Sequence, residues 1–180
     1  MTILKIDSSI TGEQSVSRQL TTAVADQLVA HNLDQQVIAR DLANEPLDHI
    51  TLAAFADTHV LDEFLAADTI VIGAPMYNFT VPSQLKAWID RIAIAGKTFR
   101  YTEAGPEGLA GDKRVIIAIS RGGYYDTSNA LEHVETYLRG VFGFLGIAPE
   151  FVHADGINYG PEQRDAGIAN GLAEVEKLAA

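Results

Sequence analysis

The sequence predicts a single α/β domain built on a parallel β-sheet. Short apolar, β-branched segments alternate along the chain with longer stretches whose apolar residues recur at helical spacing. The two central apolar segments, at 70–72 and 115–117, are apolar at every position, as expected of strands covered by helices on both faces. A chain of 180 residues is long enough for one substantial core and short for two, so residues 1–180 are expected to form one domain.

Each element has its own signal in the sequence. In the first helix, for example, Leu20, Val24 and Leu28 recur at every fourth position. The Gly/Pro-rich stretch at 105–108 is expected to be a turn within the domain. Strands are expected at residues 3–6, 37–39, 69–72 and 115–119, and from a weaker pattern at 151–152. Helices are expected at 17–31, 51–66, 83–95, 127–144 and 161–178. This alternation favours a doubly wound, five-stranded sheet with helices on both faces.

Composition excludes several classes of function. The absence of cysteine rules out disulfides, thiolate nucleophiles and Cys-ligated metals, so any redox chemistry has to come from a bound cofactor. The five histidines show no metal-ligand spacing, and no metal is expected. The formal net charge of −11 disfavours nucleic acid and membrane surfaces as partners. Without a signal-like N-terminus or a run of eighteen apolar residues, the chain is expected to be cytoplasmic.

The loop after the first predicted strand is rich in hydroxyl groups. Ser9, Ser15 and Ser17 lie between that strand and the first predicted helix. Because the first amides of a helix have no partners within it and carry the positive end of its dipole, such a loop suits an anion, most naturally a phosphate. Arg18 is a candidate to assist. The alternative for Ser17 is an ordinary helix N-cap.

The loops after the third and fourth predicted strands also carry unusual chemistry. Met76, Tyr77, Asn78 and Phe79 cluster at 74–82 and would give a flat heteroaromatic ring apolar walls and an amide partner. In the loop at 120–126, paired glycines would let the backbone approach a ligand closely, and an arginine could balance its negative charge. The residues concerned there are Ser120, Arg121, Gly122 and Gly123. Ligands of open α/β sheets bind at the carboxyl ends of the strands, so these loops and the serine loop are expected to form one site.

One rival interpretation makes the chain a hydrolase. The segment Ala118–Gly122 resembles a nucleophile elbow in which Ser120 would attack an acyl group. His133 or His153 would then act as the base, oriented by Asp126 or Asp155. Neither the serine-rich first loop nor the aromatic second loop is needed by such an enzyme.

The ordered set of motifs resembles the family of FMN-dependent NADH:azoreductases. Similarity to that family extends over nearly the whole chain, and the ordered set is specific although each short motif alone is weak. The motifs are Ser9 with 15–17, 75–79, 120–123, 99–103, 105–109, 143–147 and 159–162. The resemblance implies a flavodoxin-like fold and a homodimer with one FMN per subunit and active sites at the interface.

The resemblance also assigns residues. It implies that Ser9, Ser15, Val16 and Ser17 hold the FMN phosphate, and that Met76, Tyr77, Asn78, Phe79, Ser120, Arg121, Gly122 and Gly123 hold the ring system. Tyr101, Phe142 and Phe144 become candidates for lining the partner's substrate pocket. No side chain is expected to act as a catalytic nucleophile, because FMN carries the chemistry.

The implied reaction is ping-pong hydride transfer. NADH or NADPH would reduce FMN and leave, and a quinone or an aromatic azo compound would then be reduced, the azo compound to amines. The segment between Pro46 and the third strand is short for the family, which makes substrate range the least transferable property. A flavodoxin-like electron carrier with no nicotinamide step is the alternative from another class.

Overall fold

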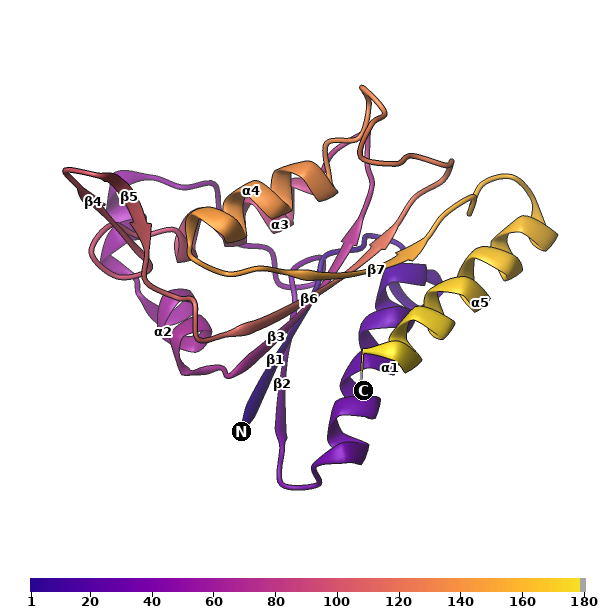
Figure 1. Cartoon of the computed structure of the whole chain (residues 1–180), viewed down its shortest axis with the longest axis horizontal. Helices are drawn as coiled ribbons and strands as arrows, with labels where there is room; N and C mark the ends of the chain where they lie inside the picture. The colour runs from indigo at the N-terminus through magenta and orange to yellow at the C-terminus, as the bar shows by residue number, and fades with distance from the viewer. Residues whose placement is uncertain (179–180) are drawn as a thin grey trace.

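A twisted, five-stranded parallel sheet forms the centre of the molecule in the computed structural model, which describes residues 1–178 (Figure 1). Its strands lie in the order β2-β1-β3-β6-β7, and every neighbouring pair is parallel. The strands are β1 (Thr2–Asp7), β2 (Gln36–Asp41), β3 (Thr69–Pro75), β6 (Arg114–Ser120) and β7 (Glu150–Ala154). This is the strand order of the flavodoxin-like doubly wound sheet, so the predicted fold class is confirmed.

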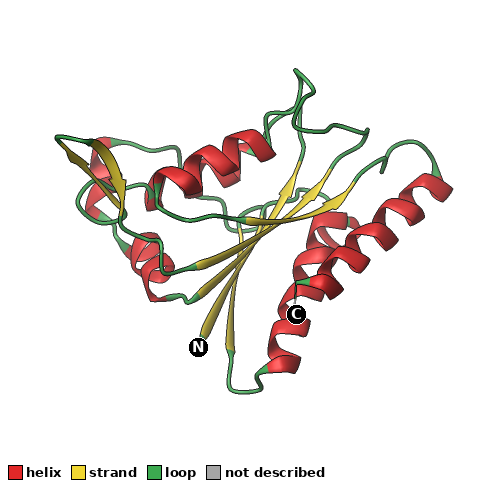
Figure 2. Ribbon diagram, in the orientation of Figure 1, coloured by secondary structure: helices red, strands yellow, loops and turns green. Residues whose placement is uncertain are grey.

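Helices cover both faces of the sheet, as Figure 2 shows. One face is covered by α1 (Val16–His31) and α5 (Pro161–Lys177), and the other by α2 (His59–Ala66), α3 (Ser83–Ile92) and α4 (Glu135–Phe144). The central strands β3 and β6 are therefore buried along most of their length, as their continuous apolar sequences predict. None of the helices within residues 1–178 is long and apolar enough to cross a membrane.

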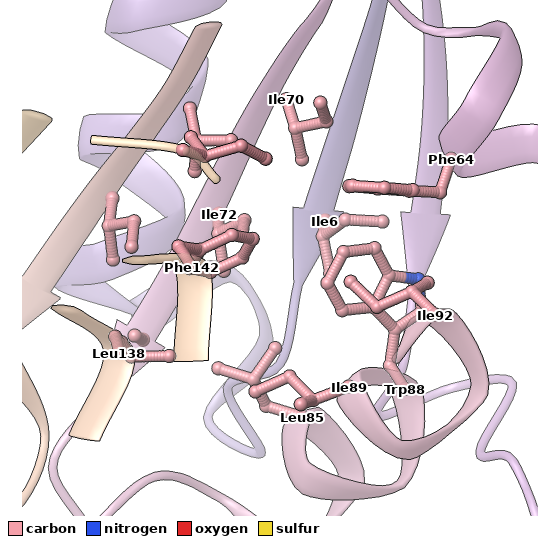
Figure 3. Close-up of a cluster of buried hydrophobic side chains, with 14 of the residues drawn as sticks. Ile6, Phe64, Ile70, Ile72, Leu85, Trp88, Ile89, Ile92, Leu138 and Phe142 are labelled. Carbon is pink, nitrogen blue, oxygen red and sulfur yellow. The ribbon is translucent and has the colours of Figure 1, made fainter. Parts of the chain in front are cut away.

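The larger core lies between the sheet and the layer of α2, α3 and α4 (Figure 3). Trp88 is fully buried there and meets Phe64 edge to face, with the ring centroids 6.0 Å apart. Parallel pairing sets Ile6 beside Ile72 and Ile72 beside Ile117, which forms a continuous apolar surface for the helices to cover. This packing holds the carboxyl ends of the central strands rigidly at one edge of the sheet.

Two predicted helices are shorter than expected. The interval 51–66 contains a 3₁₀ helix, η2 (Leu52–Ala56), and then α2, which begins only after Asp57 accepts a hydrogen bond from the amide of His59. The interval 127–144 is helical only from Glu135, because Asp126 and Asn129 accept hydrogen bonds from amides two residues further on. Such local side-chain bonds compete with helix formation.

A two-stranded antiparallel hairpin, β4 (Phe99–Thr102) and β5 (Gly105–Gly108), projects from one end of the molecule (Figure 1). The prediction of a turn at 105–108 was wrong, since these residues are extended and the reversal lies just before them, at 103–104. A Cβ atom at Gly108 would collide with the backbone of Gly146, so glycine at 108 serves close packing of the hairpin on the segment after α4.

Candidate functional site

The loops after β1, β3, β6 and β7 surround one cavity of about 620 Å³ at the carboxyl ends of the strands. This volume lies within the range of small-molecule and cofactor sites. The cavity lies beside the β1–β3 pair, where the direction of strand addition reverses, which is where ligands bind in open α/β sheets. Its lining consists of Ser9, Thr11, Glu13, Gln14, Ser15, Val16, Gln19, Pro75, Met76, Tyr77, Ser120, Arg121, Gly122, Ile157, Asn158 and Arg164.

The β1–α1 loop brings hydroxyl groups to the start of α1. A short 3₁₀ helix, η1 (Gly12–Gln14), carries the chain to Ser15, whose Oγ accepts a hydrogen bond from the amide of Arg18 at 3.1 Å. Ser15 is therefore the N-cap of α1, and the alternative that gave this role to Ser17 is wrong. Ser17 is buried with its Oγ 3.2 Å from that of Ser15, and it is outside the cavity lining.

Arg18 does not serve the cavity. Its guanidinium pairs with Asp41 at 2.8 Å and with Asp7 at 3.4 Å, and Asp7 also pairs with Lys5 at 2.6 Å. Burial opposes ionisation of Asp41, but hydrogen bonds led by that from Arg18 outweigh it and lower its pKa. The expectation that Arg18 helps to hold a phosphate is thus wrong, because its charge is neutralised by carboxylates on β1 and β2.

The β3–α3 loop makes a strained turn. Tyr77 and Thr80 exchange backbone hydrogen bonds of 3.0 and 3.2 Å, and the two residues between them, Asn78 and Phe79, have φ values of 48° and 73°. Positive φ at both central positions is the geometry of a type I′ turn, which non-glycine residues adopt only at a cost. The turn aims Met76 and Tyr77 at the cavity, whereas Asn78 and Phe79 lie outside its lining.

Hydrogen bonds join the loops to one another. The hydroxyl of Tyr77 lies 3.2 Å from Ser9 Oγ and accepts a bond of 3.2 Å from the amide of Ile10. The amide of Met76 donates to the carbonyl of Ser120 at 2.8 Å. The three predicted loops therefore form one connected site, as the sequence indicated.

The β6 loop meets the β7–α5 loop beside the cavity. The amide of Asn158 donates to the carbonyl of Gly122 at 3.0 Å, and that of Ile157 donates to the carbonyl of Arg121 at 3.1 Å. A Cβ atom at Gly122 would collide with the amide end of the Asn158 side chain, so a larger residue at 122 would force that side chain to shift. Gly123 lies outside the lining and packs against the ring of Tyr125.

The side chain of Arg121 is buried among carboxylates. Its guanidinium lies 3.3 Å from Glu132, 3.2 Å from Glu135 and 3.2 Å from Asp155. Burial raises the pKa of Asp155, although Arg121 opposes the shift. Burial also acts on Glu132, where amides of the first turn of α4 and the charge of Arg121 outweigh it and lower the pKa. Arg121 thus anchors the 120–123 loop to these acidic residues. The prediction that its charge balances that of a ligand is wrong, because the carboxylates already neutralise it.

The hydrolase interpretation has no support in the geometry. Within residues 1–178 no hydrogen bond joins Ser120 to His133 or His153. The ring nitrogens of His153 lie 3.0 Å from Glu135 and 3.2 Å from Glu174 instead. No group of three histidine or acidic side chains in the described part of the chain is arranged to hold a metal ion.

Several residues of the lining were missed from the sequence, among them Thr11, Gln14, Gln19, Ile157, Asn158 and Arg164. Ile157 and Asn158 lie in the β7–α5 loop, and Arg164 lies in the first turn of α5. Because β7 is parallel to β6, its carboxyl end reaches the same edge of the sheet, so the rule that selected the other loops could have found this one.

The three candidates for the partner's pocket differ in exposure. Tyr101 is 75% exposed on β4, and Phe144 is half-buried and packs on Phe99 at a centroid distance of 4.5 Å. Phe142 is fully buried in the larger core, so its ring cannot line a pocket and that assignment is wrong.

Comparison with known proteins agrees with the fold. A family model described as a flavodoxin-like fold matches residues 1–179. A protein of Rhizobium meliloti named FMN-dependent NADH:quinone oxidoreductase is 53% identical, and the alignment covers 100% of this chain and 96% of the relative. That alignment extends over 201 positions against 180 residues here, so the relative contains segments that this chain lacks.

Solved structures give the same result. An azoreductase from Bacillus anthracis str. Sterne superposes with a TM-score of 0.89 at 30% identity, covering 99% of this chain and 98% of that one. An FMN-dependent NADH-azoreductase from Bacillus anthracis str. Ames Ancestor, solved in complex with FMN, superposes with a TM-score of 0.86 at 25% identity, with coverage of 99% and 98%. The chain belongs to the flavodoxin-like fold family.

Proposed function

We propose that the chain is an FMN-dependent NADH:quinone oxidoreductase that also cleaves aromatic azo compounds. The observation that carries the proposal is the single cavity in which a hydroxyl-rich helix start faces a tyrosine, a thioether and a glycine-lined backbone. The names of the relatives from Rhizobium meliloti and Bacillus anthracis support the same activity.

The residues present fit FMN. The capped start of α1 offers amides without partners within the helix, together with the hydroxyls of Ser9 and Ser15, and this donor set suits a phosphate. Met76 and Tyr77 offer apolar and aromatic surface, and Gly122 contributes to the same lining. A cavity that combines donors for an anion with apolar and aromatic surface fits a phosphorylated flavin.

The three loops bind different parts of FMN. Ser9, Ser15, Val16 and Ser17 hold the phosphate, with Ser17 acting through its hydroxyl contact with Ser15. The ring is held by 76–79 and 120–123, where Asn78, Phe79 and Gly123 shape the turns that carry the lining residues. Bound FMN supplies a two-electron centre that accepts and donates hydride, so no side chain has to act as nucleophile.

The protein contributes position and electrostatics to the reaction. Backbone amides near Asn78 and Gly122, fixed by the hydrogen-bonded loops, supply fixed dipoles where negative charge develops. NADH or NADPH and the quinone or azo acceptor occupy the open side of the cavity in turn, which gives ping-pong kinetics. One cavity would serve both half-reactions, because its lining would hold FMN and leave room for each substrate in turn.

The active form proposed is a cytoplasmic homodimer. The β4–β5 hairpin extends beyond the sheet and its helices, and Tyr101 is exposed on it (Figure 1). Phe144 lies at the base of the same hairpin through its contact with Phe99. These two aromatic residues are proposed to reach the substrate side of the partner's cavity.

The experiment that tests this function is an anaerobic stopped-flow measurement on the FMN-loaded protein. Mixing with NADH is expected to bleach the oxidised flavin absorbance rapidly, and a second mixing with a quinone is expected to restore it. Ser120→Ala, saturated with FMN, is expected still to be bleached by NADH and restored by a quinone, because no proton or acyl transfer is assigned to the Ser120 side chain.

Other outcomes discriminate the alternatives. Failure of either half-reaction would refute the oxidoreductase. Slow bleaching by NADH together with fast reduction by a protein donor would favour an electron carrier. Ester hydrolysis that is lost in Ser120→Ala, from a colourless protein, would favour the acyl-hydrolase.

A further inference from the structure

A cationic side chain from α5 reaches the start of α1, where the phosphate is proposed to bind. Arg164 lies in the first turn of α5, lines the cavity, and donates a hydrogen bond from Nη2 to the carbonyl of Gln14 at 3.0 Å. Gln14 immediately precedes Ser15, the N-cap of α1. The guanidinium is thereby fixed beside the residues proposed to bind phosphate.

The other cations near the site are already neutralised. Arg18 and Lys5 pair with Asp7 and Asp41, and Arg121 is enclosed by three carboxylates. Arg164 makes no ion pair with any of residues 1–178, and a guanidinium has five N–H donors of which the bond to Gln14 uses one.

The surroundings of Arg164 make a positive charge costly without an anion as partner. Arg164 lies near the amino end of α5, where the helix dipole disfavours a cation. Phosphate binding also requires a local cation, because the chain carries a net charge of −11 and Glu13 lies in the cavity lining. A phosphate dianion at the start of α1 would supply the anion that Arg164 lacks, and Arg164 would supply the cation that the phosphate needs. The two N–H groups of a guanidinium also match the spacing of phosphate oxygens.

We propose that Arg164 binds the phosphate of FMN and makes the site select FMN over the unphosphorylated flavin. This inference rests on the proposed function, since it names the cation of the same cofactor site. Arg164 is then a binding residue contributed by α5, which completes a phosphate site otherwise made of amides and hydroxyls from the β1–α1 loop.

The test is equilibrium binding of FMN and riboflavin to the apoprotein, followed by quenching of flavin fluorescence. Arg164→Gln is expected to weaken FMN binding by about tenfold or more while leaving riboflavin binding unchanged. Arg164→Lys, which keeps the charge without the fork, is expected to fall between the two. Lys177→Gln, which removes the same charge about 20 Å away at the other end of α5, is the matched control and is expected to bind both flavins as the parent protein does.

A second measurement covers the case in which riboflavin binds too weakly to titrate. The dissociation constant of FMN is expected to rise with salt in the parent protein, and to rise less steeply in Arg164→Gln, because the ion pair is screened. Melting temperatures of the apoproteins show whether each variant is folded.

The outcomes separate this inference from the function on which it rests. A parent protein that binds no FMN refutes the proposed cofactor. A parent protein that binds FMN, with Arg164→Gln binding it equally well and with the same salt dependence, overturns the role of Arg164 alone. Equal weakening of FMN and riboflavin would also overturn it, because Arg164 would then act on the ring or on the fold of the loop.

Discussion

Phe79 is the residue at which backbone strain is concentrated. Its φ of 73° lies in the left-handed region, which costs a residue with a Cβ atom about 1–2 kcal/mol. The ring is 41% exposed and touches Tyr125 edge to face, with centroids 6.2 Å apart, so packing returns little of that cost. Strain of this kind, held in place by surrounding structure, is typical of ligand-binding turns.

Truncation of Phe79 to two different residues isolates the strain. Phe79→Gly and Phe79→Ala both remove the ring, but only glycine adopts the positive φ without penalty. The glycine variant is therefore expected to be more stable than the alanine variant by about 1 kcal/mol in urea unfolding of the apoprotein. Equal stabilities, or a more stable alanine variant, would show that the turn stores no strain.

Among the elements, α1 depends on its cap. Ser15 Oγ holds the amide of Arg18, and the neighbouring loop has to stay open for an anion. Replacing a serine N-cap by alanine costs about 1 kcal/mol, whereas glycine costs only a few tenths. Ser15→Ala is thus expected to lower the stability of the apoprotein by about 1 kcal/mol, and Ser15→Gly by much less.

Chemical denaturation of the apoprotein measures this difference. Ser128→Ala is a suitable comparison, because it removes an exposed hydroxyl that bonds to Asp126 in the loop before α4 and caps no helix. An unchanged midpoint for Ser15→Ala would contradict the prediction, because the cap would then contribute nothing to stability.

Some elements of the fold could be predicted from the sequence and others could not. All five strands of the main sheet were predictable, because the apolar β-branched segments report burial on both faces. The late start of α4 was not predictable. Asp126 and Asn129 form local turns that compete with a helix, and the sequence alone does not show which of the two forms. The β4–β5 hairpin was missed because its pattern is too short and too polar for a strand signal.

The residues of the candidate site were also only partly predictable from the sequence. The cavity-lining residues Ser9, Met76 and Gly122 were predictable, since strand ends position loop residues whatever the details of packing. The orientation of the Arg18 and Arg121 side chains was not predictable, because the sequence does not reveal which distant acidic residues pair with them. Arg164 was missed because no local sequence feature indicates that a residue on the surface of α5 contacts the β1–α1 loop.

At the scale of the whole molecule, Arg121 and its carboxylates tie β6, β7 and α4 together behind the cavity. Glu132 and Glu135 have lowered pKa values, since hydrogen bonds and nearby cations outweigh the effect of burial. The stability that these groups contribute is present above their ordinary pKa and is lost as the pH falls through the lowered pKa. Asp155, whose pKa is raised by burial, acts in the opposite sense and loses its contribution as the pH rises.

Glu132→Gln is therefore expected to destabilise the protein at neutral pH by about 2 kcal/mol, and to reduce the loss of stability below about pH 4.5. Urea unfolding at a series of pH values measures both effects. Glu107→Gln, which breaks an exposed ion pair with Arg100, is the control and is expected to change little. The same acid dependence in Glu132→Gln and the parent protein would contradict this assignment.

A crystal structure of the FMN-loaded protein would show whether three loops at one edge of the sheet bind FMN. Flavin density is expected in the cavity, with the phosphate at the start of α1 beside Ser9 and Ser15, and the ring between the 76–79 and 120–123 loops. Density for FMN elsewhere on the molecule, or a cavity that stays empty at saturating FMN, would contradict this expectation.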